Sequence, residues 1–102
     1  MAYSYPFKTT DEQTKLTVWA KGRTIPDKDG KHWSPAEWRY DICGLPIKYS
    51  DHGDTNSKNG WEIDHIKPTA KGGPNTFDNL QPLQWGNNRA KGDNYPWSCP
   101  PR

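Results

Sequence analysis

Apolar residues are scattered thinly along this chain, and their spacing differs between its two halves. After an acidic start, Leu16, Trp19 and Ala20 recur at intervals that place them on one side of a helix. Thr10 can cap the start of this helix, and Gly22 is a natural end for it. The pattern therefore predicts a helix that begins at Thr10 and ends before Gly22.

A second helix start occurs at residues 34–37, which read Ser-Pro-Ala-Glu. Serine caps helices, proline is favoured in the first turn, and a glutamate at this spacing completes a capping box. We predict a short helix here that carries Trp38 and Tyr40. The two helices together predict a helical extension over residues 10–40.

The second half of the chain has a different pattern, which predicts strands as well as a helix. Residues 61–66 have strand character and follow a polar, turn-rich segment. Residues 79–83 form a further short strand, which Pro82 restricts to an edge position. Residues 85–91 can form a brief helix that Gly92 ends. These elements predict a small, irregular α+β domain with helices at its N-terminal end.

The composition limits the fold to one small domain, which we place over residues 1–102. Only 30% of the residues are hydrophobic, but the chain has six Trp and five Tyr. Because a large aromatic side chain buries on the order of 150–250 Å², the aromatic residues must fill much of the core. No apolar run approaches the roughly 20 residues of a membrane span, so we expect no membrane partner.

The two cysteines, Cys43 and Cys99, are too few for a disulfide framework or a four-thiolate zinc site. The first residues contain neither the basic nor the apolar region of a secretory leader. Disulfides are rare in cytoplasmic proteins. The sequence therefore predicts a cytoplasmic protein with reduced thiols.

The second half also brings a carboxylate, an imidazole and an amide close together in the sequence. Asp64 and His65 are adjacent, and Asn88 lies in the last predicted helix. Hydrolysis of a phosphodiester needs an activated water and neutralisation of the charge that develops on the phosphoryl oxygens. His65 can act as general base, because an imidazole is largely unprotonated near neutral pH. Asp64 and Asn88 offer oxygen ligands, which suit Mg²⁺ or Mn²⁺ better than zinc.

The net charge of +2 does not by itself indicate a nucleic-acid partner. Positive residues nevertheless accompany the candidate site. Lys91 follows Asn88 by three residues, hence on nearly the same side of the helix, and is our candidate for a catalytic contact with the substrate phosphate. Lys67 and Arg89 are further candidates for binding nucleic acid. The alternative, a solvated charged surface without a partner, stays open.

The order and spacing of these residues resemble the HNH endonuclease family. The resemblance covers about a third of the chain and rests on Asp64, His65, Pro68, Gly72, Gly73, Asn79, Leu80, Leu83, Asn88, Lys91 and Gly92. It implies a ββα-metal motif, also called a His-Me finger, with its core at residues 61–92. It further implies that the strand gives way at Asp64 and His65, so that both address one metal. Asn79 would brace the loop and so orient His65.

Many small HNH proteins carry two Cys-x-x-Cys pairs that bind a structural zinc, and this chain departs from that pattern. Cys43 matches one of these cysteines, but Tyr40, Gln84 and Asn87 occupy the other three positions. A structural zinc is therefore not expected. We expect aromatic packing to replace it, by Trp38, Tyr40, Trp61 and Trp85.

The resemblance implies a metal-dependent endonuclease that nicks DNA one strand at a time and leaves 5′-phosphate and 3′-hydroxyl ends. Two alternatives stay open. One is a non-catalytic nucleic-acid-binding module on the same scaffold, and the other is a nuclease that cleaves RNA or serves as a toxin. Nothing predicts a small-molecule substrate. The sequence has no interface signature, so it does not determine the oligomeric state.

Overall fold

Helix α1 (Glu12–Trp19) opens the part of the chain that the computed structural model describes, residues 12–101. The predicted cap, Thr10, lies outside the described residues. Val18 and Trp19 are buried, whereas Leu16 is 44% exposed. The predicted apolar side of Leu16, Trp19 and Ala20 is therefore wrong, because Ala20 lies beyond the end of the helix and is exposed, and Trp19 is buried together with Val18.

The predicted helix at residues 34–40 is also wrong, because this segment enters a three-stranded antiparallel sheet. The strands are β1 (Arg23–Thr24), β2 (Trp38–Tyr40) and β3 (Pro46–Lys48), and β2 lies between the other two. Only a turn forms at Ser34, whose carbonyl accepts two backbone N–H groups. Pairing with two neighbours satisfies the backbone of β2 and outweighs the local helix signal. The described part of the N-terminal extension thus contains one helix and two strands.

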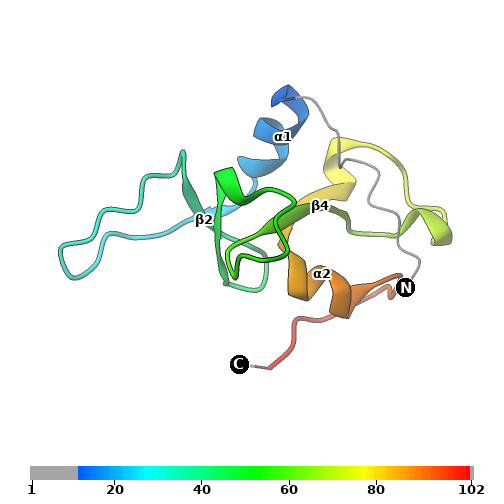
Figure 1. The fold of residues 1–102 in the computed structure, drawn as a ribbon. Coiled ribbons are helices and arrows are strands. Elements are labelled where there is room, and N and C mark those ends of the chain that lie inside the picture. The colour runs from blue at the N-terminus through cyan, green and yellow to red at the C-terminus, as the bar shows by residue number, and fades with distance from the viewer. Residues whose placement is uncertain (1–11, 102) are drawn as a thin grey trace.

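The second half of the chain folds as predicted. Strand β4 (Trp61–His65) pairs antiparallel with β5 (Leu80–Gln84), and helix α2 (Trp85–Lys91) follows β5 directly (Figure 1). Gly92 ends α2 with a φ of 52°, and its N–H donates to the carbonyl of Asn88. Short 3-10 helices occur in the connections: η1 (Tyr49–Asp51), η2 (Thr69–Lys71) and η3 (Phe77–Asn79). Antiparallel strands combined with helices confirm the α+β class.

The two faces of the β4–β5 sheet have different neighbours. Trp61 and Ile63 of β4 point into the hydrophobic core. The core cluster consists of Val18, Trp19, Ile47, Trp61, Ile63 and Leu80, with Tyr49 packed against it. Glu62 and Asp64, the intervening residues of β4, contact α2 on the opposite face. Strand β4 therefore directs apolar side chains to the core and acidic side chains to the helix.

Aromatic packing centres on Trp61. The rings of Trp19 and Tyr49 lie 5.1 Å and 6.0 Å from the Trp61 ring, measured between centroids. Trp38 and Tyr40 are half-buried and lie outside the core cluster. Of the four aromatic residues expected to pack here, Trp61 is thus part of the core cluster, whereas Trp38, Tyr40 and Trp85 are half-buried outside it.

Cys43 and Cys99 form a disulfide, so the prediction of reduced thiols is wrong. The bond joins the turn between β2 and β3 to the C-terminal tail, across 56 residues of sequence. Local sequence could not reveal it, because the return of the tail is a tertiary event. Within residues 12–101, no helix is long and apolar enough to cross a membrane. The cysteines no longer support a cytoplasmic location.

Candidate active site

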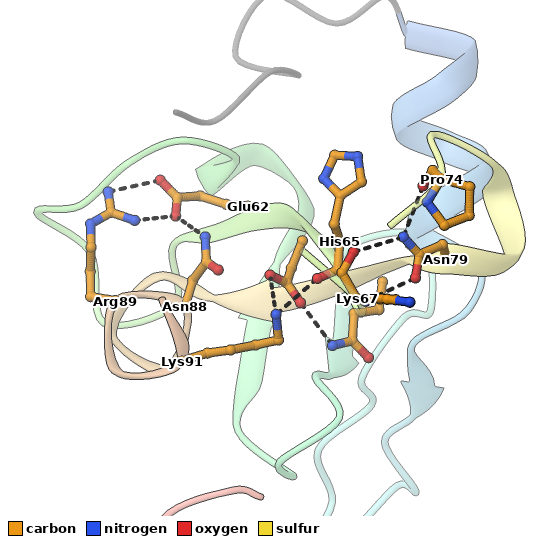
Figure 2. A network of polar contacts seen from close by, with 10 residues as sticks. Glu62, His65, Lys67, Pro74, Asn79, Asn88, Arg89 and Lys91 are labelled. Atoms are coloured by element: carbon orange, nitrogen blue, oxygen red, sulfur yellow. Dashed lines mark hydrogen bonds and ion pairs between the residues drawn. The ribbon is translucent and has the colours of Figure 1, made fainter. Parts of the chain in front are cut away.

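Asn79 closes the loop that connects β4 to β5. Its Oδ1 atom accepts a hydrogen bond from the backbone N–H of Lys67 at 2.9 Å. Its Nδ2 atom donates to the carbonyls of Lys67, at 3.0 Å, and Pro74, at 2.8 Å. Figure 2 shows this side chain between Lys67 and Pro74. The amide of Asn79 therefore holds the backbone directly after His65.

Gly73 permits the same loop to fold tightly. Its N–H donates to the carbonyl of Pro68 at 2.9 Å. A Cβ atom at this position would lie 1.7 Å from the carbonyl oxygen of Lys67, which is far inside a van der Waals contact. Only glycine fits against the backbone here. Gly73 and Asn79 thus fix the backbone of Lys67 from two sides.

His65 is the last residue of β4 and is only 1% exposed. Its Nε2 atom lies 3.1 Å from Oδ1 of Asn75. An amide oxygen only accepts hydrogen bonds, so Nε2 carries the proton in this contact and Nδ1 is the nitrogen that can take up another. Asn75 follows Pro74, whose carbonyl Asn79 holds. The loop that Asn79 closes therefore also positions the imidazole.

Asp64 is fully buried on the α2 side of β4. Its Oδ2 accepts from Nε2 of Gln81 at 3.0 Å, and its Oδ1 lies 3.3 Å from Nζ of Lys91. Lys91 also donates to the carbonyl of His65 at 2.8 Å. Burial raises the pKa of Asp64, and the Gln81 hydrogen bond and the Lys91 charge oppose this shift. The structure therefore places a buried ion pair where the sequence predicted a metal ligand and an exposed phosphate contact.

Asn88 points to Glu62, a residue that the sequence analysis did not include in the site. Nδ2 of Asn88 donates to Oε1 of Glu62 at 2.7 Å. Arg89 binds both oxygens of the same carboxylate, at 2.5 Å and 3.0 Å (Figure 2). Glu62 is 4% exposed. It precedes Asp64 by two residues, and the two-residue period of a strand could have shown that both acids share one face.

Asp64 and His65 leave opposite faces of β4. The ladder between β4 and β5 is regular here, with Asp64 opposite Gln81 and His65 opposite Leu80. Successive side chains of a regular strand alternate between its faces. The expected distortion of the strand at this pair is therefore wrong. Asp64 faces α2 with Asn88 and Lys91, whereas His65 faces the loop that contains Asn75.

The α2 side of β4 presents oxygen atoms that suit a divalent cation. Among residues 12–101, no three Asp, Glu, His or Cys side chains form a metal-binding group. A cation would therefore depend on Asp64 and on the amide oxygen of Asn88, which the bond to Glu62 does not use. A carboxylate has about four acceptor positions, and the bonds from Gln81 and Lys91 use one at each oxygen of Asp64. These oxygen donors fit a cation such as Mg²⁺ or Mn²⁺. The ammonium group of Lys91 would compete with that cation for the carboxylate of Asp64.

Two antiparallel strands, the helix that packs on them and a loop closed by an asparagine define a ββα nuclease motif. The profile of the HNH endonuclease family matches residues 41–94, which is over half of the chain. The chain therefore belongs to the HNH endonuclease family, whose members are nucleases that generally use a divalent metal ion and act on nucleic acid. No curated protein and no solved structure matches the chain.

Proposed function

We propose that the protein is a metal-dependent endonuclease that hydrolyses phosphodiester bonds in DNA and nicks one strand at a time. The observation that carries this proposal is that a chain of the HNH family has Asp64 and Asn88 on the α2 side of β4 and His65 at the end of the same strand, on its other face. A carboxylate, an imidazole and an amide are the groups that metal-assisted hydrolysis needs. Residues 61–92 form the proposed catalytic core within a single domain of residues 1–102.

His65 is the proposed general base. Its Nδ1 atom takes the proton from the attacking water, while Asn75 holds Nε2. Asn79 is a positioning residue, because it fixes the loop that carries Asn75. A well-placed general base typically contributes about 10²–10⁴-fold to the rate.

Asp64 and Asn88 are the residues that would hold the cation, with Mg²⁺ or Mn²⁺ as the proposed ion. A cation bound there would neutralise charge on the phosphoryl oxygens and stabilise the leaving oxygen. Gln81 and Lys91 keep the carboxylate of Asp64 turned towards α2. In this proposal Lys91 contributes by holding the carboxylate of Asp64 in place.

The contacts of Lys91 change the set of proposed phosphate contacts. Nζ of Lys91 is already bound to Asp64 and to the carbonyl of His65, so Lys91 is no longer proposed as a phosphate contact. Lys67 follows the buried end of β4 and stays a proposed contact. Arg89 binds Glu62, but 46% of its side chain is exposed, so it also stays a proposed contact.

Plasmid nicking in Mg²⁺ or Mn²⁺ tests the proposal. We expect His65→Ala to lower the nicking rate by at least about 100-fold in a chain that still folds, as circular dichroism would show. His32→Ala is the matched control, because the side chain of His32 is 73% exposed and contacts Asp27 far from β4 in the sequence. Equal nicking by the two variants would remove His65 from the mechanism.

The ion pair between Lys91 and Asp64 favours a second candidate, a nucleic-acid-binding module without catalysis. In that case Lys91 would permanently neutralise the carboxylate that a cation needs. Salt-sensitive DNA binding by the wild-type chain, with no cleavage in any divalent ion, would favour this candidate over the nuclease.

A further inference from the structure

The outer face of the β1–β2–β3 sheet carries aromatic and positive side chains. Cross-strand register pairs Arg23 with Tyr40, and Trp38 with Lys48. The other face is defined by Ile47, which is fully buried in the core. Because side chains alternate along a strand, the four paired residues all lie on the face turned away from the core. We call this set, together with Trp33 and Lys31, the outer sheet face.

Each aromatic ring of the outer sheet face has a cation beside it. The Arg23 guanidinium lies 5.1 Å from the centroid of the Tyr40 ring, and Nζ of Lys48 lies 5.7 Å from that of Trp38. The ring of Trp33 meets that of Trp38 edge-on at 5.1 Å. Nζ of Lys31 lies 5.6 Å from the Trp33 ring. Three half-buried rings therefore lie on this face, two of them in contact, with a positive charge beside each ring.

Within residues 12–101, none of these three cations forms an ion pair with a carboxylate. The ion pairs there involve Lys15, His32, Arg89 and Lys91. A hollow of about 330 Å³ adjoins these rings, with Trp33 and Tyr40 in its lining beside Lys28 and one carboxylate, that of Asp27. This volume falls within the range of about 300–1,000 Å³ that is usual for ligand pockets. The face thus offers positive charge, ring surface and a recess together.

We propose that the outer sheet face binds an unpaired strand of nucleic acid, an inference that rests on the proposed nuclease function. Aromatic rings next to cations bind single strands, because bases stack on the rings while the cations contact phosphates. A duplex hides the flat surfaces of its bases and would use only the charges. The N-terminal part of the chain supplies most of the face, since Arg23, Lys31, Trp33 and Trp38 precede the residues that match the HNH family. The segment between β1 and β2 extends away from α2 and β4 in Figure 1, so it can contact a strand beyond the cleaved bond.

Fluorescence anisotropy with a labelled oligothymidylate, and with a blunt duplex of the same length, tests this proposal. Binding is measured in EDTA, so a chain that fails to nick DNA can still be judged for this surface. We expect Lys31→Glu to weaken oligothymidylate binding several-fold and to reduce the salt slope by about 0.7, the value for one phosphate contact on a single strand. Lys58→Glu is the matched control, because Lys58 is an exposed lysine outside the face.

Substitutions of Trp33 distinguish the contribution of base stacking to the affinity from that of positive charge. Trp33→Leu should weaken oligothymidylate binding about tenfold, which corresponds to one stacked base, whereas Trp33→Phe should retain most of the affinity. Neither substitution of Trp33 should alter the affinity for the duplex. Equal affinities of Lys31→Glu and Lys58→Glu, wild-type affinity of Trp33→Leu, or an equal loss of duplex and single-strand affinity in Trp33→Leu would each overturn the proposal. So would a wild-type chain that binds neither DNA, and a protein partner would then have to be sought for this face.

Discussion

The orientation of one amide, that of Asn88, depends on a buried residue of β4. Glu62 accepts a hydrogen bond from Nδ2 of Asn88 at 2.7 Å and binds Arg89 with both oxygens. A carboxylate can only accept hydrogen bonds, so it attracts the NH₂ side of the amide and turns the carbonyl oxygen away from itself. Glu62 therefore determines which atom of Asn88 can face a cation.

We predict that Glu62→Gln weakens Mn²⁺ binding by about tenfold, because partners of metal ligands typically contribute 10–100-fold to affinity. A glutamine can present either its oxygen or its NH₂ group to Asn88, so the amide loses its fixed orientation. Electron paramagnetic resonance of free Mn²⁺ measures the affinity independently of cleavage. Glu37→Gln, at an exposed position, is the control. Equal affinities of the two variants would show that Asn88 does not depend on Glu62.

Lys91 illustrates how much of a residue's environment could be predicted from the sequence. Helical spacing places Lys91 and Asn88 on nearly the same side of α2, but it does not say whether that side faces solvent or the sheet. The contact between Lys91 and Asp64 shows that it faces the sheet. A residue's position along a helix is local information, whereas its burial depends on which element packs against the helix.

At the scale of elements, Asp41 joins the β2–β3 turn to the start of α2. One carboxylate oxygen accepts the backbone N–H groups of Cys43 and Leu45, both at 2.9 Å. The other accepts from the backbone N–H of Gln84 at 2.9 Å and from Nδ2 of Asn87 at 3.0 Å. Cys43, Gln84 and Asn87 are three of the positions at which the resemblance to small HNH proteins implied cysteines. In this chain a buried carboxylate makes the link between the two segments.

Removal of this carboxylate should destabilise the whole domain. Asp41→Ala would leave four donors without their acceptor, and we expect the free energy of unfolding to fall by about 3 kcal/mol. Urea denaturation measures the change. Asp54→Ala is the control, because its exposed carboxylate accepts a single backbone N–H, that of Asn56. Similar losses in the two variants would contradict the role of Asp41 as a link between elements.

At the scale of the whole molecule, the disulfide brings the C-terminal tail back to the site. Cys99 is bound to Cys43, and the tail residue Trp97 lines a hollow of about 170 Å³ that Gln81 and Lys91 also line. Gln81 and Lys91 are the two residues that hold Asp64. The disulfide thus keeps the tail next to the buried side of the candidate active site.

Loss of the disulfide should lower stability because the unfolded chain gains conformational freedom. For a closed loop of this length the chain-entropy model gives about 4 kcal/mol, and measured values are commonly 2–4 kcal/mol. We therefore expect Cys43→Ala/Cys99→Ala to reduce the free energy of unfolding by about 3 kcal/mol in denaturant titrations. Reductant should reproduce the loss in the wild-type chain and leave the double variant unchanged. A wild-type chain that is insensitive to reductant would contradict this expectation.

The sequence by itself determined β4, β5 and α2, because their signals are local: strand-forming runs bounded by turns, and Gly92 at the end of the helix. It also determined the family, since the order of Asp64, His65 and Asn88 needs no coordinates. Tertiary structure decided that residues 38–40 form a strand, because β1 and β3 supply hydrogen-bond partners that outweigh a capping box. It also decided that Asp64 and His65 face opposite sides of β4 and that the two cysteines meet. Those outcomes depend on partners distant in sequence, whose approach no local pattern records.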